Sequence, residues 1–346
     1  MQLIRGNDFD SYFDKLSDIY THGCALSIGN FDGIHKGHDS IINKLKIIAK
    51  QNNLKTGVML FDPSPKLYFA LSRGESISRN LVLPLRDKLK ILKDSGVDFV
   101  FLMRFNHSLS VLSAENFVNN YLIKKLNVKS LVVGEDFRFG YKGSGNYKLL
   151  DAYSKKGFFS VHKSITKNYT QINLNSNKHM NYKISSTQLR KYIKYGDFSS
   201  LHKLLGREYK LSGRVQHGNQ LGRTIGFPTI NIKMPNNIAL AGVFCVKVLI
   251  NDSWMSGVAN IGFRPTLSSN LSNSYKNEYK KRCLLEVHLF DYNQSIYGIN
   301  VEVVFYHKLR EEQKFGSIDA LKQQLSKDEK AARKYFIFQK DKDFVK

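Results

Sequence analysis

The pattern of apolar and helical segments changes near Gly206, and this change restricts the possible folds more than any other feature. Before Gly206, short apolar segments alternate with helical patterns, and after it short apolar segments follow one another with Gly, Asn and Asp turns between them. Alternating strands and helices are typical of βαβ units around a parallel sheet, whereas consecutive short strands are typical of an antiparallel barrel. We therefore expect two domains, residues 1–205 and 206–346.

Hydrophobic periodicity predicts the elements of both domains. The expected strands of the first domain are 24–28, 56–61, 97–103, 129–133 and 158–161, and its expected helices are 38–51, 85–94, 114–126, 146–155, 186–195 and 198–205. The expected strands of the second domain are 209–216, 228–232, 243–250, 255–261, 284–290 and 301–306, followed by a helix at 317–327. This pattern predicts an α/β domain with a parallel sheet, then a small antiparallel β-barrel with a C-terminal helix.

Composition agrees with a globular protein of two domains. The chain has 346 residues, and a single hydrophobic core usually stops growing near ~250 to 300. No segment approaches the about 18 apolar residues of a membrane span, and the N-terminus lacks the apolar run of a signal peptide, so we expect a cytoplasmic protein with no membrane partner. Cys24, Cys245 and Cys283 each lie in an apolar strand-like segment and are expected to be reduced core residues.

The net charge is strongly positive. The 53 Lys and Arg residues against 29 Asp and Glu residues give +24, which suits nucleic acid, an anionic membrane surface or small molecules that carry phosphate. The positive charge is spread along the chain, so solvated helix faces explain it equally well.

The string "GNFDGIHKGH" (29–38) predicts a phosphate site in the first domain. It follows the strand 24–28 and should form a turn that starts a helix near Lys36, so His35 and His38 lie one helical turn apart on one face. A helix N-terminus binds anions, and two imidazoles there can stabilise charge on a triphosphate as a bond breaks. The candidate nucleotide-binding residues are Gly29, Asn30, Phe31, Asp32, Gly33 and Gly37, and the candidate catalytic residues are His35 and His38.

This string resembles the His-x-Gly-His signature of the Rossmann-like nucleotidyltransferase superfamily. A second element, "ISSTQLR" (184–190), resembles the Ile-Ser-Ser-Thr-x-Ile-Arg element of one branch of it. The resemblance implies that Ser185, Ser186, Thr187 and Arg190 also bind nucleotide, although "ISST" alone is more typical of a helix cap than of a nucleotide site.

The string "GNQLGRTIGFPTINI" (218–232) predicts a second phosphate site, in the second domain. Thr229 and Asn231 are two apart on a strand and therefore point to the same side, where their oxygens suit Mg²⁺ that is mostly held by nucleotide phosphates. A glycine-rich hairpin is the alternative. The further nucleotide-binding candidates are Gly222, Arg223, Gly226, Phe227 and Pro228.

Both halves together resemble the prokaryotic bifunctional riboflavin kinase/FMN adenylyltransferases, also called FAD synthetases. Further matching stretches are "VGEDFRFG" (133–140), "GVANIGFRPT" (257–266), "LEVHLFD" (285–291) and "KLREEQKFGSIDALKQQLSKD" (308–328). The resemblance implies that the first domain transfers AMP from ATP to FMN and that a riboflavin kinase-like barrel phosphorylates riboflavin. It implies Glu286 as the kinase base and Thr229 and Asn231 as ligands of Mg²⁺ or Mn²⁺. The implied partners are riboflavin, FMN, FAD and ATP, with no nucleic acid, and the oligomeric state stays open.

The chemistry of the two reactions supports different residues in the two domains. A ribityl hydroxyl is a poor nucleophile, so the carboxylate of Glu286 is useful as its proton acceptor, whereas the phosphate of FMN is already anionic. In "EDFRFG", Phe137 and Phe139 should lie on one side of an extended segment and Arg138 on the other, as a flavin next to an anion requires. Core aromatics at a strand end are the alternative. The flavin-binding candidates are Asp136, Phe137, Arg138, Phe139, Asn146 and Arg310.

Two departures from the family lie in the first domain. Ser64 occupies the place of the histidine in a Phe-x-Pro-His-Pro stretch, and the segment 140–146 lacks the usual arginine and acid. Two other functions remain open: a basic RNA-binding protein that reuses a synthetase-like domain, and an adenylyltransferase for pantetheine phosphate or nicotinate mononucleotide.

Overall fold

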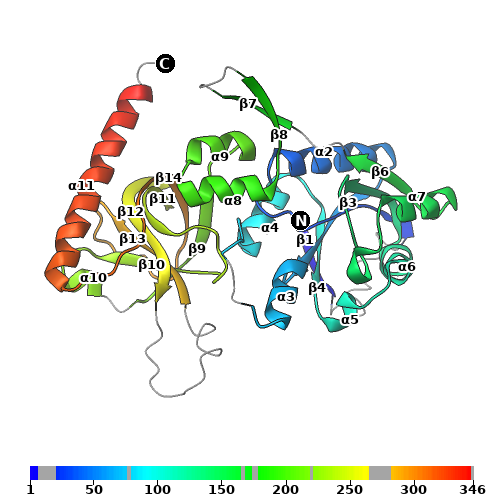
Figure 1. Cartoon of the computed structure of the whole chain (residues 1–346), viewed down its shortest axis with the longest axis horizontal. Coiled ribbons are helices and arrows are strands. Elements are labelled where there is room, and N and C mark those ends of the chain that lie inside the picture. The colour runs from blue at the N-terminus through cyan, green and yellow to red at the C-terminus, as the bar shows by residue number, and fades with distance from the viewer. Residues whose placement is uncertain are drawn as a thin grey trace. The chain divides into compact units, whose positions relative to one another are not determined.

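A computed structural model describes residues 1–6, 21–75, 79–164, 168–173, 178–218, 221–264 and 282–343. The chain forms two compact units (Figure 1). The first unit comprises Met1–Ser76 and Lys88–Ser185, and the second comprises Ile77–Asp87 and Ser186–Lys346. The domain boundary expected between residues 205 and 206 stays a prediction. In the part of the chain that the structure describes, no helix is both long and apolar enough to cross a membrane.

The first unit is built on a six-stranded parallel sheet with the order β1-β4-β3-β2-β5-β6. Its strands are β1 Gln2–Arg5, β2 Cys24–Ile28, β3 Lys55–Asp62, β4 Phe99–Arg104, β5 Val128–Gly134 and β6 Ser160–Ser164. Every residue of β2 is buried, because helices cover both faces of a parallel sheet. The expected parallel sheet is confirmed, and the sheet carries the site at the carboxyl end of β2.

The helices of the first unit connect these strands, and two of them, at residues 65–72 and 107–110, lie outside the expected helices. The helices of this unit are α2 Lys36–Gln51, α3 Pro65–Ser72, α4 Leu85–Asp94, α5 His107–Ser110, α6 Ala114–Phe117 and α7 Tyr147–Lys155, with a π-helical stretch at Val118–Lys125. The first three residues of α4 belong to the second unit. The predicted helix 114–126 is divided between α6 and the π-helical stretch. A two-stranded antiparallel hairpin, β7 Asn168–Asn173 and β8 Lys178–Lys183, was not expected.

The second unit contains a closed six-stranded barrel with the order β10-β13-β12-β11-β14-β9, which confirms the expected antiparallel barrel. Its strands are β9 Lys210–Gln216, β10 Thr229–Met234, β11 Gly242–Ile250, β12 Ser253–Arg264, β13 Arg282–Leu289 and β14 Asn300–Arg310, and short helix α10 Leu221–Thr224 precedes β10. Alternate residues such as Ile232, Leu285 and Ile261 are fully buried. The strands therefore have an apolar face, as well as the face that carries the site described below.

Three further helices belong to the second unit. They are α8 Ser186–Tyr195, α9 Phe198–Leu205 and the C-terminal helix α11 Ile318–Asp343, which is longer than expected. Helix α11 lies along the barrel (Figure 1) and packs Ala332 and Phe336 against Val243, Cys245 and Val258. Burial of these apolar side chains against each other holds the helix on the barrel.

The second unit also includes a segment from the first half of the sequence. Leu81 forms a bridge with Ile238, and the Tyr209 hydroxyl donates to the carbonyl oxygen of Val82 at 2.8 Å. The backbone N–H and the hydroxyl of Ser212 both donate to the Asp87 carboxylate, at 3.1 and 2.5 Å. Residues 79–87 therefore pack against the barrel. The order of motifs along the chain does not predict this packing.

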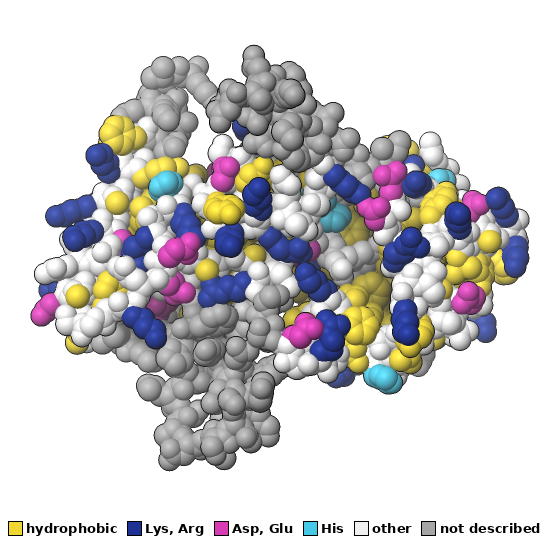
Figure 2. Space-filling model, in the orientation of Figure 1, with side chains coloured by type: hydrophobic (Ala, Val, Ile, Leu, Met, Phe, Trp, Pro, Cys, Tyr) yellow, Lys and Arg dark blue, Asp and Glu magenta, His cyan; other side chains and the backbone are white. Residues whose placement is uncertain are grey.

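The distribution of positive side chains on one face of the molecule bears on the net charge. On the face drawn in Figure 2, Lys and Arg side chains are interspersed with acidic, polar and hydrophobic ones. This distribution is typical of solvated surfaces, in agreement with the second of the two explanations for the charge.

Candidate active sites

The first site lies where β2 turns into α2. Phe31, Gly33 and Ile34 have positive φ angles of 43°, 89° and 39°, a conformation that residues other than glycine rarely adopt. Phe31 and Ile34 are 1% and 0% exposed, so their side chains anchor this turn in the core. We call residues 29–34 the nucleotide turn, because it contains the predicted nucleotide-binding residues Gly29 to Gly33.

His35 and His38 lie together at the start of α2. His35 is the N-cap residue, and its Nδ1 accepts a hydrogen bond from the backbone N–H of His38 at 3.4 Å. The two rings stack with centroids 3.9 Å apart and planes 20° apart. Helix N-termini attract anions. The position of the two histidines therefore allows them to contact a triphosphate, as the sequence predicts.

Gly37 lies close to Ile184, the first residue of the second motif, which belongs to the first unit. A Cβ at Gly37 would lie 3.0 Å from the His35 ring and 3.8 Å from the carbonyl oxygen of Ile184. A side chain at this position would therefore displace His35. Ile184 is followed by the predicted residue Ser185. The beginning of the second motif, which belongs to the first unit, therefore lies close to the first motif.

The remaining residues of "ISSTQLR" begin helix α8 in the second unit. Ser186 is the first helical residue and Thr187 is exposed. The Arg190 guanidinium donates from Nε to the carbonyl oxygen of Asn80 at 2.5 Å. The structure thus shows an intramolecular partner for Arg190, and its contact with a nucleotide stays a prediction.

A cavity of about 260 Å³ in the first unit is lined by aromatic rings. Phe137 and Phe139 stack with centroids 5.4 Å apart and planes 19° apart. The other lining residues include Phe61, Phe69, Phe105, Phe117, Arg138 and Lys142. A flat conjugated ring with a nearby negative charge suits aromatic walls and two cationic side chains.

Two predicted flavin-binding residues have other partners. Asp136 is ion-paired with Lys183, and the hydrogen bond from that ammonium lowers the pKa of the Asp136 carboxyl. Asn146 is the N-cap of α7, and its Oδ1 accepts from the N–H of Leu149 at 3.2 Å. Neither is among the described residues that line the aromatic cavity. Ser64, the departure from the family, has a local role as N-cap of α3.

The second site is built by the register of three strands. Asn231 on β10 pairs with Glu286 on β13, and Glu286 pairs with Asn260 on β12. Directly paired residues of antiparallel strands have their side chains on the same face of the sheet. The register therefore brings Asn231, Glu286 and Asn260 into one row, although they are far apart in the sequence.

Thr229 lies on the same face, two residues before Asn231 on β10, and pairs with His288. The His288 ring lies with Nδ1 2.9 Å from the carbonyl oxygen of Pro228, so Nδ1 carries the proton and donates it. The Phe227 ring meets the His288 ring edge to face at 5.3 Å. His288 thus contacts the turn that precedes Thr229.

Asn231 has the features of a ligand residue. It is 5% exposed, and among the described residues its Oδ1 has no hydrogen-bond partner, while its Nδ2 donates to the Thr229 carbonyl oxygen at 3.5 Å. Buried oxygens are normally paired, so this acceptor fits a cation or a donor that the described residues do not supply.

The glycine-rich segment before β10 is folded tightly. A Cβ at Gly222 would lie 2.3 Å from the carbonyl oxygen of Phe227, so only glycine fits there, and Gly226 has a φ of 85°. Arg223 belongs to α10, but its side chain lies outside the described residues.

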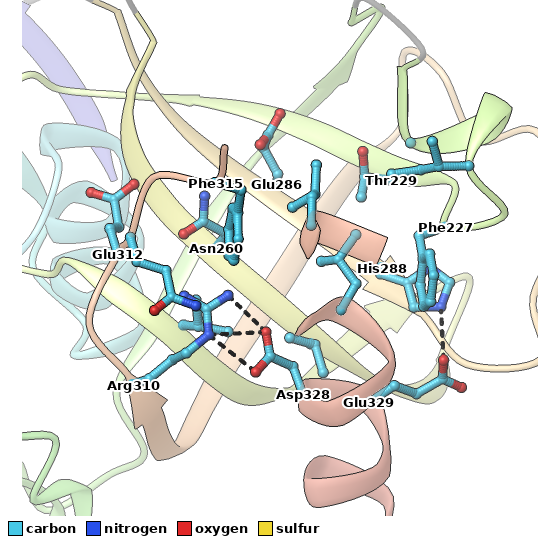
Figure 3. A pocket seen from close by; sticks show the side chains of 17 residues that line it. Phe227, Thr229, Asn260, Glu286, His288, Arg310, Glu312, Phe315, Asp328 and Glu329 are labelled. Carbon is cyan, nitrogen blue, oxygen red and sulfur yellow. Dashed lines mark hydrogen bonds and ion pairs between the residues drawn. The ribbon is translucent and has the colours of Figure 1, made fainter. Parts of the chain in front are cut away.

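A cavity of about 200 Å³ opens beside this row (Figure 3). Its walls come from the barrel, from α11 and from the segment that joins β14 to α11. Its lining residues include Thr229, Val258, Asn260, Glu286, His288, Arg310, Glu312, Phe315, Leu321, Leu325 and Asp328. It therefore combines an apolar surface with several charged groups.

Arg310 and Glu312, at the wall of this cavity, have oppositely charged partners. The guanidinium of Arg310 donates to both carboxylate oxygens of Asp328, at 3.1 and 2.8 Å (Figure 3). Glu312 lies 3.8 Å from the Arg79 guanidinium, yet burial raises the pKa of the Glu312 carboxyl. Asp328, Glu312 and Asn260 lie within the matching stretches of sequence, but no local pattern marked them, because their role depends on the strands around them.

Comparisons with known proteins agree with this division of sites. A family model described as FAD synthetase matches residues 18–178, and one described as riboflavin kinase matches residues 205–336. The two models cover separate parts of the chain, which contain the first and the second site.

Full-length relatives are similar to nearly the whole chain. Proteins named bifunctional riboflavin kinase/FMN adenylyltransferase from Escherichia coli (strain K12) and Haemophilus influenzae are 38% and 39% identical, over 97% of this chain and 98% and 99% of theirs. A Bacillus subtilis protein of the same name is 35% identical over 90% of this chain and 92% of its own. A Streptococcus pneumoniae crystal structure titled as a macrolide-efflux protein is 31% identical, covers 90% of this chain and 94% of its own, and has a TM-score of 0.65. The chain belongs to the family of bifunctional riboflavin kinase/FMN adenylyltransferases.

Proposed function

We propose that the chain catalyses two consecutive reactions. The barrel region (206–346) phosphorylates riboflavin with ATP to give FMN, and the sheet region (1–205) transfers AMP from ATP to FMN to give FAD and pyrophosphate. The observation that carries the proposal is the register that pairs Glu286 with Asn231 beside an apolar cavity. Neither an RNA-binding protein nor an adenylyltransferase for another precursor accounts for this second site.

In the kinase reaction, the apolar cavity receives the isoalloxazine ring and the row of polar residues receives the ribityl end. Glu286 accepts the proton of the terminal ribityl hydroxyl. At the same time the hydroxyl oxygen bonds to the γ-phosphorus of ATP, and the bond between the γ-phosphorus and ADP breaks. Thr229 and Asn231 would hold Mg²⁺ or Mn²⁺, whose charge balances that of the phosphates. Arg310, held by Asp328, lies at the wall of the same cavity and contacts the flavin.

The barrel's nucleotide is held by its glycine-rich segment. Gly222, Arg223, Gly226, Phe227 and Pro228 lie directly before Thr229 in the sequence. The tight fold at Gly222 fixes the path of this segment, while a Cβ at Gly226 would meet nothing within 4 Å. Glycine residues let a backbone approach phosphate oxygens closely.

In the transferase reaction, a phosphate oxygen of FMN attacks the α-phosphorus of ATP, and pyrophosphate leaves. No base is needed, because the attacking group is already anionic. The N-terminus of α2 and the His35–His38 pair stabilise the charge that develops on the leaving pyrophosphate. The aromatic cavity with Phe137, Phe139 and Arg138 receives the flavin of FMN. Ser185, Ser186, Thr187 and Arg190 stay candidates for nucleotide binding on the basis of their motif.

One incubation tests both reactions. The protein is mixed with riboflavin, ATP and Mg²⁺, and FMN and FAD are separated by chromatography. We expect FMN first and FAD later, and FAD directly when FMN is supplied. Absence of flavin products would contradict the proposal. A parallel incubation with pantetheine phosphate or nicotinate mononucleotide in place of riboflavin would then show whether AMP is transferred to another precursor.

A further inference from the structure

A buried lysine lies next to the nucleotide turn. Lys88 on α4 is 9% exposed, although lysine is almost never buried without a partner. Its ammonium donates to the carbonyl oxygen of Asn30 at 3.1 Å and lies 4.0 Å from Oδ1 of Asp32. The side chains of Lys88 and Asp32 are each 11% exposed. Both partners belong to the nucleotide turn, and Lys88 lies 58 residues after Asn30 in the sequence.

The nucleotide turn needs such support. Its backbone has positive φ at Phe31 and Ile34, two residues with Cβ atoms, and strained conformations persist only where several contacts hold them. The core holds the side chains of these two residues, while Lys88 holds the backbone at Asn30. Because His35 follows this turn directly, a change at Asn30 or Asp32 moves the start of α2.

The charge of Lys88 has a second effect. Asp32 is 8% exposed and lies three residues before His35. An unpaired carboxylate at this place would repel the triphosphate that the helix N-terminus attracts. The ammonium of Lys88 opposes this negative charge.

We propose that Lys88 is a positioning residue for AMP transfer: it holds Asn30 and Asp32 so that His35 and His38 face the triphosphate. This inference rests on the transferase function proposed above. Lys88 acts through the turn, so its loss lowers kcat for FAD formation more than it raises KM for ATP.

The test compares four proteins with FMN and ATP as substrates: the parent, Lys88→Met, Lys88→Arg and Lys93→Met. Lys93 is an exposed lysine of the same helix and serves as the matched control. Lys88→Met should lower kcat roughly 10- to 100-fold, the scale of one lost charge-assisted hydrogen bond. Lys88→Arg should retain most of the rate, and Lys93→Met should equal the parent.

Riboflavin phosphorylation, measured on the same samples, separates positioning from folding. It should stay within about threefold of the parent in every variant. If Lys88→Met does not yield folded protein, Lys88→Gln, which keeps a donor but no charge, takes its place with the same expected split between kcat and KM. A parent that makes no FAD overturns the proposed function itself.

Three results with an active parent overturn the role of Lys88 alone. They are an unchanged kcat in Lys88→Met, equal losses in both reactions, and a rise in KM for ATP that exceeds the loss in kcat. The last would indicate direct contact with ATP.

Discussion

The two units build their sites in different ways. In the first, the ten consecutive residues 29–38, which run from the end of β2 into the first turn of α2, form the candidate site. Its geometry comes from backbone angles and from a helix N-terminus. In the second, the site is a row of side chains from three strands, faced by α11. A site made by one turn tolerates little change in the local backbone, whereas a site made by register depends on the pairing of the whole barrel.

The largest expected effect separates the two reactions at the barrel. Glu286→Gln removes the proton acceptor and should lower riboflavin phosphorylation by on the order of 10²-fold or more. FAD formation from supplied FMN should be unchanged, because that reaction needs no base. Steady-state assays of both reactions on one preparation measure this. A variant with near-normal FMN production would show Glu286 to be a solvated strand residue.

The converse change is at the sheet. His38→Ala removes one donor for the leaving pyrophosphate and should lower kcat for FAD formation by about 10²-fold, with a smaller rise in KM for ATP. Riboflavin phosphorylation should survive, since the barrel has its own phosphate site. Equal loss of both rates would point to damaged folding instead.

A third change tests whether the second unit depends on the segment 79–87. Tyr209→Phe removes the buried hydrogen bond to Val82 and should lower the free energy of unfolding by about 1–2 kcal/mol. Heat inactivation should begin at a lower temperature for riboflavin phosphorylation than in the parent. Tyr141→Phe, which changes an exposed tyrosine of the first unit, is the control. Unchanged heat inactivation in Tyr209→Phe would mean that the segment contributes little to the barrel.

A smaller effect should depend on pH. Burial raises the pKa of Glu312 above its ordinary value near 4.5, so its contribution to stability is present below the unfolded pKa and is lost as pH rises through the folded pKa. Glu312→Gln removes this loss, so the stability of the variant relative to the parent should increase from pH 4 upward. We expect less than about 1 kcal/mol, because the side chain is 39% exposed. Denaturant unfolding at several pH values measures it, and an opposite slope would contradict the raised pKa.

The smallest effect concerns the reactivity of the three cysteine thiols, which should not differ between the two units. Burial raises the pKa of Cys24 and Cys245 to about 12 and that of Cys283 to about 11. Since the thiolate is the reactive form, an alkylating reagent at pH 8 should leave all three thiols of the native protein unmodified and label them after unfolding. Rapid labelling of one native cysteine would indicate local opening of its unit.

The patterns in the sequence predicted most of the architecture, and the misses have physical reasons. Strand β1 is only four residues long, too short to show alternation. The hairpin strands β7 and β8 are polar, so no apolar pattern marks them. Helix α11 continues past the expected end at 327 through a lysine-rich segment, because Ala332 and Phe336 lie one turn apart and are buried against the barrel.

The sequence by itself determined the two contiguous motifs. The order of glycines and histidines in 29–38 specifies a turn and a helix start. The string 222–231 specifies a tight glycine segment followed by two oxygen-bearing side chains on one face of a strand. These are local properties of consecutive residues, which steric limits on φ and the period of a strand decide without any distant partner.

Only the tertiary structure decided the partners. Three contacts join residues that are distant in the sequence. They are the pairing of Glu286 with Asn231 and Asn260, the ion pair between Arg310 and Asp328, and the contact of Lys88 with the nucleotide turn. Such contacts depend on strand register and on how helices pack, and a shift of one residue would turn each strand side chain to the opposite face. The chemistry of each group could therefore be read from its residue type, but its partner came from the fold.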